Sequence, residues 1–314
     1  MNRRPIIIDC DPGYDDIQAL ILAKQCENVR VVAVTAVSGN VALKYTEKNA
    51  LAITEYLGFD VPVASGAERP LFRDPLFAEE HHGEEGLLGM NLPEPSKKVV
   101  DKKAWDFIYD IAVELKGELE IVAVGPLTNI AIALMKYPEL KDLVKTIYIM
   151  GGAILSGNSR FSTEFNIHVD PEAAKRVFES GIPFYLCPLD LTRQSYITDE
   201  EIVKVEEMGN KETKFFADIT KLSMVTFSGN LPQRKDGIVG SNMHDPCTLL
   251  FADDNSIFDF EECYINVETF GKNAGKTVTD CYSDKQAEVK NGYLVKSVDR
   301  KAFVERVYSL LSKY

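Results

Sequence analysis

The stretch that most constrains this chain is residues 6–16, which reads IIIDCDPGYDD. Three consecutive isoleucines predict a strand without a polar face, which is typical of a buried strand in a parallel sheet. Pro12 and Gly13 predict a turn directly after this strand, and the apolar residues from Ile17 onward predict a helix. Strand, turn and helix in this order begin a βαβ unit.

Four carboxylates lie in this short stretch, namely Asp9, Asp11, Asp15 and Asp16. Ligands of open α/β sheets bind beyond the carboxyl ends of the strands, where this turn would lie. Acids so close together repel one another unless a positive group lies among them, and hard oxygen ligands favour calcium or magnesium. A helix dipole would account for Asp15 and Asp16 but not for the acids at the strand end. The pattern therefore predicts a divalent cation site.

The remaining sequence continues the alternation of strand and helix. Further buried strands are expected at 29–37, 61–64, 119–124, 146–150 and 183–187, with helices between them. Residues 258–296 instead predict antiparallel strands, followed by a helix at 299–311. We therefore expect one domain over residues 1–314, of the α/β class. Its central sheet would be open, mostly parallel and Rossmann-like, flanked by helices, with antiparallel additions near the C-terminus.

Charge and hydropathy exclude several classes of partner. The formal net charge of −13 argues against nucleic acid or an anionic membrane, since both require basic surfaces. No apolar segment approaches the length of about 20 residues that spans a bilayer, and no signal peptide is recognisable. The six cysteines form no CxxC pair, and several lie in apolar runs. We expect reduced core thiols, which are typical of a cytoplasmic protein.

Polar residues without an obvious structural role gather at the ends of the predicted strands. They include Asn40, Thr128, Asn129, Asn166, His244 and Asp245. Two long loops interrupt the alternation. The loop at 66–98 contains His81 and His82 and is expected to lie over the carboxyl-end crevice as a lid, and the loop at 153–165 carries Asn158, Glu164 and Phe165. Carboxylates, amides and an imidazole around a cation suit a polyhydroxylated substrate.

The segment DCDPGYDD at 9–16 resembles the DxDPGxDD signature of the inosine–uridine-preferring nucleoside hydrolase family. Later blocks of that family are matched in order by GPLTN at 125–129, MGG at 150–152, EFN at 164–166 with DPEAA at 170–174, and HDP at 244–246. The resemblance spans roughly residues 5 to 300.

The resemblance implies a calcium site and a role for each matched residue. The implied calcium ligands are Asp11, Asp16, the main-chain carbonyl group of Thr128, and Asp245. The implied catalytic residues are Asp11 as general base and His244 as the acid near the leaving base. The implied contacts to the ribose hydroxyl groups are Asp15, Asn40, Asn166 and Asp245, and those to the 5′ end are Met150, Asn158 and Glu164. Phe165 and His82 complete the substrate-binding set, with His82 near the base.

The implied activity is calcium-dependent hydrolysis of ribonucleosides to nucleobase and ribose, in nucleoside catabolism and salvage, by a homodimer or homotetramer. Carboxylates near an oxocarbenium-like transition state are suited to this reaction. One alternative is a haloacid-dehalogenase-like phosphohydrolase, in which Asp9 would attack phosphorus. The other is a non-catalytic protein that binds nucleosides or sugars.

Several of these residues also have a structural interpretation. Asn40 is a candidate cap of the following helix, and Asn129 is expected to cap a helix or form a turn. Met150 is a candidate core residue, and His168 precedes a helix cap in an apolar stretch, which favours a structural role. Purine or pyrimidine preference stays open. Phe227 is the nearest aromatic candidate for base stacking, but the segment that follows it cannot be aligned with the family pattern.

Overall fold

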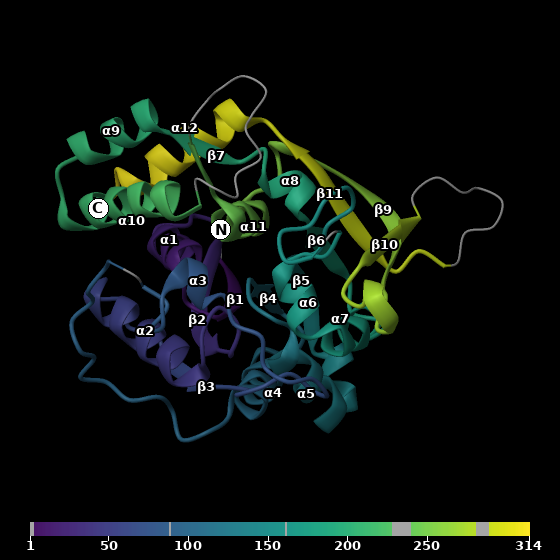
Figure 1. Ribbon diagram of the computed structural model, residues 1–314. Helices are drawn as coiled ribbons and strands as arrows, with labels where there is room; N and C mark the ends of the chain where they lie inside the picture. Colours follow the sequence, from purple (N-terminus) through teal and green to yellow (C-terminus); the bar gives the residue numbers. More distant parts are fainter. Residues whose placement is uncertain (1–2, 88, 161, 228–239, 281–288) are drawn as a thin grey trace.

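A nine-stranded sheet forms the centre of the computed structural model, which describes residues 3–87, 89–160, 162–227, 240–280 and 289–314 (Figure 1). In spatial order its strands are β10 (Thr277–Asp280), β9 (Phe258–Val267), β11 (Gly292–Val298), β6 (Phe184–Cys187), β5 (Val144–Met150), β4 (Leu119–Ala123), β1 (Arg4–Cys10), β2 (Val29–Ala36) and β3 (Val63–Ser65). The strands from β3 to β11 run parallel, whereas β9 pairs antiparallel with both β11 and β10. The predicted mostly parallel sheet with antiparallel additions is confirmed.

Strand β1 lies at the point where the strand order reverses. It pairs with β2 on one edge and with β4 on the other, so the chain winds outward in both directions from this position. Ligands of such sheets bind at this switch point, beyond the carboxyl ends of the strands. The turn that follows Cys10 lies there, and the topology therefore places the acidic turn where a ligand would bind.

Alternate side chains of the strands enter two separate hydrophobic clusters. Ile6 and Ile8 belong to one cluster and Ile7 to the other, and all three are buried. Because successive side chains of a strand point to opposite faces, a strand covered on both faces needs apolar residues at every position. This explains the isoleucine run in β1.

Helices cover both faces of the sheet (Figure 1). One cluster includes residues of α1 (Tyr14–Ala23), α2 (Leu43–Tyr56), α9 (Asp199–Glu207), α10 (Lys211–Phe227), α11 (His244–Asp253) and α12 (Arg300–Leu311). The other includes residues of α4 (Ala104–Leu115), α5 (Thr128–Lys136) and α7 (Pro171–Phe178). The remaining elements are the short helices α3 (Glu79–His82), α6 (Phe165–Val169) and α8 (Leu189–Thr192), the 3-10 helices η1 (Pro138–Asp142) and η2 (Gly271–Asn273), and the antiparallel strands β7 (Tyr196–Thr198) and β8 (Gly240–Asn242).

The cysteine prediction is confirmed in part. Cys10, Cys26, Cys187 and Cys247 are free and buried, as expected. Cys263 is disulfide-bonded, so the expectation of a reduced thiol is wrong there, and Cys281 lies outside the described residues. Within the described part of the chain, no helix combines the length and the apolar character that crossing a membrane requires.

Candidate active site

The turn between β1 and α1 is held in shape by the side chain of Asp16. Its Oδ1 atom accepts a hydrogen bond from the backbone N–H of Asp11 at 3.0 Å, and its Oδ2 atom accepts one from Gly13 at 3.0 Å. Both donors precede the helix, so this carboxylate closes the turn back on itself. A Cβ atom at Gly13 would lie 2.6 Å from the His82 ring, which explains why the turn carries glycine.

Asp9 points away from this turn into a buried polar cluster. Its Oδ1 atom accepts hydrogen bonds from the Thr35 hydroxyl group and, at 2.8 Å, from Asn129 Nδ2. Asn129 also contacts the Ala36 carbonyl group and the Ala67 N–H, so it joins three segments. The expectation that Asn129 caps a helix or forms a turn is wrong, because its side chain joins β1, the end of β2 and the segment after β3. Burial raises the pKa of Asp9 to about 7.

Asp11 lies between two glycines at the end of β1. Its Oδ2 atom accepts the backbone N–H of Asn40 at 2.6 Å, whereas Oδ1 has no hydrogen-bond partner among the described residues. A Cβ atom at Gly39 would approach Oδ2 to 2.1 Å, and one at Gly125 would approach Oδ1 to 2.6 Å. Glycine at both positions therefore makes room for a buried carboxylate with one oxygen left for a ligand.

Three carboxylates converge beside Asp11. Asp15, Asp16 and Asp245 each offer an oxygen atom, and these atoms lie within 4.8 Å of one another. Burial raises the pKa of Asp16 to about 7, and burial with the negative charge of Asp16 raises the pKa of Asp11 well above its ordinary value. The pKa of Asp245 is raised in the same direction by burial and by the neighbouring acids. A cation at this position would relieve the repulsion, and the oxygen-only donor set fits calcium or magnesium.

A cavity of about 160 Å³ opens next to these acids. The predicted site residues that line it are Asp15, Asn40, His82, Met150, Asn158, Glu164, Phe165, Asn166, His244 and Asp245. Asp11 and Asp16 are not among the lining residues, but an oxygen atom of Asp16 lies within 4.8 Å of those of the lining acids Asp15 and Asp245. Thr128 is not among the lining residues. It begins α5, and its hydroxyl group donates to Asp170 at 2.8 Å, outside the lining of the cavity. Val124, which directly follows β4, lines the cavity instead.

Amide and carboxylate groups along one wall hold one another in place. Asn166 Nδ2 donates to the carbonyl groups of Val124 at 2.8 Å and Met150 at 3.3 Å. Glu164 caps α6 by accepting from the N–H groups of Asn166 and Ile167, and burial raises its pKa to about 7. Asn158 Oδ1 accepts the N–H of residue 165 at 2.9 Å, which ties the loop to α6. This wall is therefore rigid and rich in polar groups.

Three histidines line the cavity, namely His81, His82 and His244, and the last two belong to the predicted site. His244 begins α11, and burial together with the charge of Arg193 lowers its pKa to about 4. His82 ends α3 within the loop at 66–98, its ring centroid lies 5.2 Å from that of Tyr14, and burial lowers its pKa to about 3. This loop does reach the carboxyl-end crevice, as predicted, because the Ala78 N–H donates to the Asn40 carbonyl group at 2.9 Å.

Some residues of the cavity were not found from the sequence, and some predicted ones lie elsewhere. Tyr14, Leu189, Arg193 and Asn242 contribute to the lining, although no motif singles them out. His168 does not line the cavity, and its Nδ1 atom lies 2.8 Å from Ser159 Oγ, in keeping with its expected structural role. The side chain of residue 227 lies outside the described part, so its stacking role stays a prediction.

The fold and the cavity define a class of protein. Buried carboxylates lie at the switch point of a Rossmann-like sheet, and amides and an imidazole surround the cavity next to them. This arrangement is typical of a metal-assisted enzyme that acts on a hydroxylated small molecule. Residues 6–305 match the family model described as inosine-uridine preferring nucleoside hydrolase, and the chain belongs to this family. The predicted family and the predicted class of enzyme, a nucleoside hydrolase, are confirmed.

Individual relatives agree with this assignment. The chain is 39% identical to the pyrimidine-specific ribonucleoside hydrolase RihA of Shewanella sp. (strain MR-7), over 99% of this chain and 97% of the relative. It superposes on a plant nucleoside hydrolase, the PpNRh1 enzyme, with a TM-score of 0.91, 28% identity and complete coverage of both chains. A purine-preferring ribonucleoside hydrolase from Gardnerella vaginalis gives a TM-score of 0.90 and 31% identity, over 99% of this chain and 100% of that chain. The phosphohydrolase alternative is not favoured.

Proposed function

We propose that this chain hydrolyses the N-glycosidic bond of ribonucleosides in a calcium-dependent reaction that releases free nucleobase and ribose. The observation that carries the proposal is the convergence of Asp15, Asp16 and Asp245 at a cavity that His244 also lines, near Asp11, whose Oδ1 atom has no hydrogen-bond partner among the described residues. Membership of the nucleoside hydrolase family supports the same activity. Nucleoside hydrolysis needs a base for water, groups that stabilise positive charge on the sugar, and help for the departing nucleobase.

The proposed calcium ligands are Asp11, Asp16 and Asp245. Their support is the Oδ1 atom of Asp11, which lacks a hydrogen-bond partner in the described part of the chain, and the close oxygen atoms of the other two acids. We propose the main-chain carbonyl group of Val124 in place of that of Thr128, because Val124 lines the cavity and precedes the glycine that faces Asp11. When bound, calcium would supply the positive charge that these acids lack and would make a nearby water molecule easier to deprotonate.

In the proposed mechanism Asp11 is the general base. The Asn40 N–H holds one carboxylate oxygen, and the other is left to take the proton from water. The contacts proposed for the ribose hydroxyl groups are Asp15, Asn40, Asn166 and Asp245. Those proposed for the 5′ end are Met150, Asn158 and Glu164, with Phe165 beside them. All of these side chains line the cavity, which supports their assignment.

His244 is proposed to assist the leaving base. Its lowered pKa means that the ring is neutral near pH 7, so it would act first as a hydrogen-bond donor to the base and pass its proton only as the bond breaks. His82 is proposed to contact the base as well, since it lies in the same cavity on α3. Carboxylates beneath the sugar would stabilise its positive charge in the transition state.

The proposal is tested by incubating the calcium-loaded protein with inosine, uridine and cytidine and measuring the release of reducing sugar. Both purine and pyrimidine nucleosides are needed because one relative is named pyrimidine-specific and another purine-preferring. We expect release from at least one substrate. No release from any of them, with calcium shown to be bound, would contradict the proposal.

The remaining alternative is a protein that binds nucleosides without turnover. In that case calorimetry would show tight binding of the same nucleosides while no sugar appeared. The Oδ1 atom of Asp11, which has no hydrogen-bond partner among the described residues, is available to take a proton from water, and turnover needs such a base whereas binding alone does not. Assembly into a homodimer or homotetramer stays a prediction.

A further inference from the structure

The last residue of helix α8, together with the turn that follows it, contacts the segment at His244. Thr192 ends α8, is buried, and places its Oγ1 atom 2.7 Å from Nδ1 of His244. The same turn holds the residue before His244, because the Met243 N–H donates to the Ser195 carbonyl group at 2.8 Å. The imidazole is therefore fixed both through its backbone and through one ring nitrogen. Nε2 is the ring nitrogen left for the cavity that His244 lines.

The hydrogen bond between Thr192 and His244 has two possible directions. In a neutral imidazole one nitrogen carries the proton, and a hydroxyl group can either donate to the bare nitrogen or accept from the protonated one. Thr192 is 0% exposed, and among the described residues its hydroxyl group has one hydrogen-bond partner, Nδ1 of His244. If the hydroxyl group accepted, its own proton would be buried without an acceptor, which is unfavourable. The hydroxyl group therefore donates to Nδ1.

We propose that Thr192 is a positioning residue that donates to Nδ1 of His244 and thereby keeps the ring proton on Nε2, facing the cavity. This inference rests on the proposed function for its catalytic consequence, since a proton on Nε2 is what a departing nucleobase needs. Without this hydroxyl group the neutral ring can carry its proton on either nitrogen and can rotate, so fewer molecules present a donor to the base.

Hydrogen bonds on both sides of Thr192 anchor α8 to the loop at 153–165. The Asp190 carboxylate accepts the N–H groups of Ile154 at 2.7 Å and Leu155 at 3.1 Å, and Arg193 donates to the Ser156 carbonyl group at 2.8 Å. Helix α8 thus joins the loop that carries Asn158 to the ring of His244. The hydrogen bond to His244 therefore comes from a helix that is itself anchored to this loop.

The tautomer itself is tested without any substrate. Nitrogen NMR of histidine-labelled protein distinguishes a protonated from a bare ring nitrogen, and His244→Gln identifies the signals of His244. We expect the pattern of an Nε2-protonated ring in the wild type and in Thr192→Ser, which keeps the hydroxyl group. Thr192→Val, which has nearly the same shape, should show a mixture of tautomers. An Nδ1-protonated ring in the wild type, or an unchanged pattern in Thr192→Val, would overturn the proposal.

The catalytic consequence is tested with two leaving groups. For nucleosides, whose bases leave poorly, we expect Thr192→Val to lower kcat roughly tenfold, the effect of one hydrogen bond, with KM little changed. For p-nitrophenyl riboside, which needs no proton on its leaving group, kcat should stay near wild type, and Thr192→Ser should restore nucleoside turnover. Equal losses on both substrates would overturn the positioning role.

A matched control separates this effect from a general loss of stability. Thr54 is also a buried threonine, but its hydroxyl group donates within α2 to the carbonyl groups of Ala50 and Leu51. Thr54→Val should leave both the NMR pattern and the leaving-group dependence unchanged. If no nucleoside is cleaved by any variant, the proposed function fails, whereas the NMR result still decides which nitrogen Thr192 controls.

Discussion

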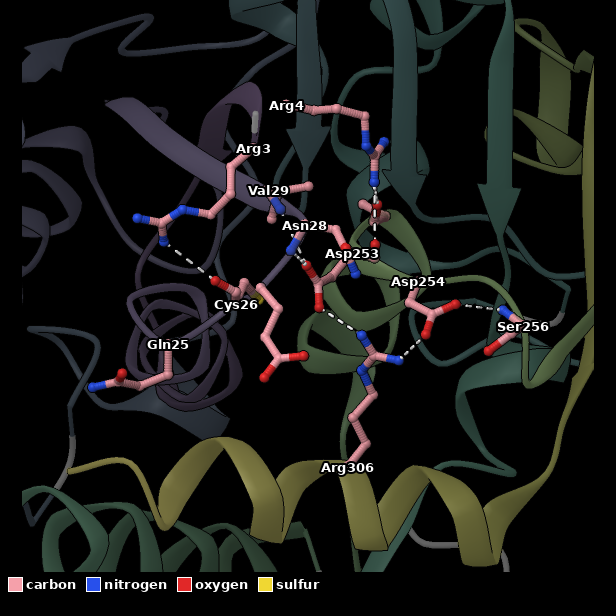
Figure 2. A network of polar contacts seen from close by, with 12 residues as sticks. Arg3, Arg4, Gln25, Cys26, Asn28, Val29, Asp253, Asp254, Ser256 and Arg306 are labelled. Atoms are coloured by element: carbon pink, nitrogen blue, oxygen red, sulfur yellow. Dashed lines mark hydrogen bonds and ion pairs between the residues drawn. The ribbon is translucent and has the colours of Figure 1, made fainter. Parts of the chain in front are cut away.

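Helix α11 carries a buried acid at each of its ends, and the two acids differ in whether they have an ion-pair partner. At its first turn, Asp245 faces the acidic turn after β1, and no ion pair with arginine or lysine involves this group of acids in the described residues. At its last turn, Asp253 is equally buried but lies in a network of arginines and backbone donors (Figure 2). The same helix thus joins a region of unpaired acids to a region of paired ones.

The paired region shows what this fold does with an acid that has no ligand. Asp253 Oδ1 accepts the backbone N–H groups of Asn28 and Val29, and Oδ2 pairs with Arg306 at 2.6 Å (Figure 2). Arg306 also pairs with Asp254 at 2.5 Å. Arg4 of β1 likewise pairs with the buried Glu120 of the adjacent strand β4 at 2.5 Å. Since the chain can neutralise buried acids with arginine, the lack of such a partner around Asp11 among the described residues supports our proposal that an external cation has that role there.

The largest expected effect comes from removing one acid at the unpaired end. Asp11→Asn keeps the shape of the side chain but cannot take a proton, so kcat should fall by about 10²- to 10⁴-fold. In the presence of a calcium chelator the same variant should unfold at no lower temperature than the wild type, because the substitution removes a buried negative charge without breaking an ion pair. Steady-state kinetics and thermal unfolding measure the two effects.

Asp253→Asn at the paired end is the matched comparison and should behave in the opposite way. It leaves one contact of the partly buried Arg306 guanidinium group without its fully buried charge partner, which should cost about 3 kcal/mol of unfolding free energy in urea. The kcat of the folded enzyme should stay near wild type, since residue 253 lies at the far end of α11 from His244. An equal loss of stability in both variants would mean that the two groups of acids do not differ in their ion-pair partners.

Calcium itself should act on one region alone. Ligand that binds only the folded state stabilises it by about 2.7 kcal/mol at a hundredfold excess over Kd, and the gain should appear as a higher unfolding midpoint of the wild type. Asp16→Asn should lose most of this gain, whereas Asp253→Asn should keep it, because its substitution leaves the oxygen cluster intact. A calcium response that survives in Asp16→Asn would place the ion elsewhere.

Local sequence patterns predicted the parts of the site that are local in the chain. The strand, the Pro–Gly turn and the start of α1 follow one another directly, so their propensities and the position of Asp11 and Asp16 could be inferred together. The order of strands and helices predicted the mostly parallel sheet, which in turn placed the turn at the carboxyl edge.

Contacts between distant segments could not be inferred in this way. Thr192 lies 52 residues from His244, and Asn129 lies 120 residues from Asp9. Thr192 and Asn129 are small polar residues next to helix ends, and capping is the ordinary role of such residues there. Only the packing of α5 and α8 against the sheet shows which atoms their side chains contact. Val124 contributes to the cavity at a strand end, so no side-chain pattern could single it out.

The smallest expected effect is a dependence of stability on pH that separates the two regions. Burial raises the pKa of Asp9, Asp16 and Glu164 to about 7 in the folded chain, so the folded state binds more protons than the unfolded state as the pH rises from about 4 toward 7. Stability falls with pH wherever the folded state binds more protons. His82 and His244 oppose this trend as long as the unfolded state still binds protons on them, which ends about one pH unit above their ordinary pKa of about 6.5, and they offset only part of the loss.

Asp254, which pairs with Arg306, contributes no pH dependence of stability between about pH 4 and pH 8. The hydrogen bond from Arg306 lowers the pKa of Asp254 to about 2, so its stabilisation is complete above about pH 4 and is lost only as the pH falls through about 2. Between about pH 6.5 and pH 8, the metal-free wild type should therefore lose about 1–2 kcal/mol of unfolding free energy, measured by urea titration with a chelator present. Asp16→Asn should show a smaller loss and Asp253→Asn an unchanged one. A stability that rises with pH in this window would mean that the acids at the end of β1 are compensated within the chain, as they are around Arg306.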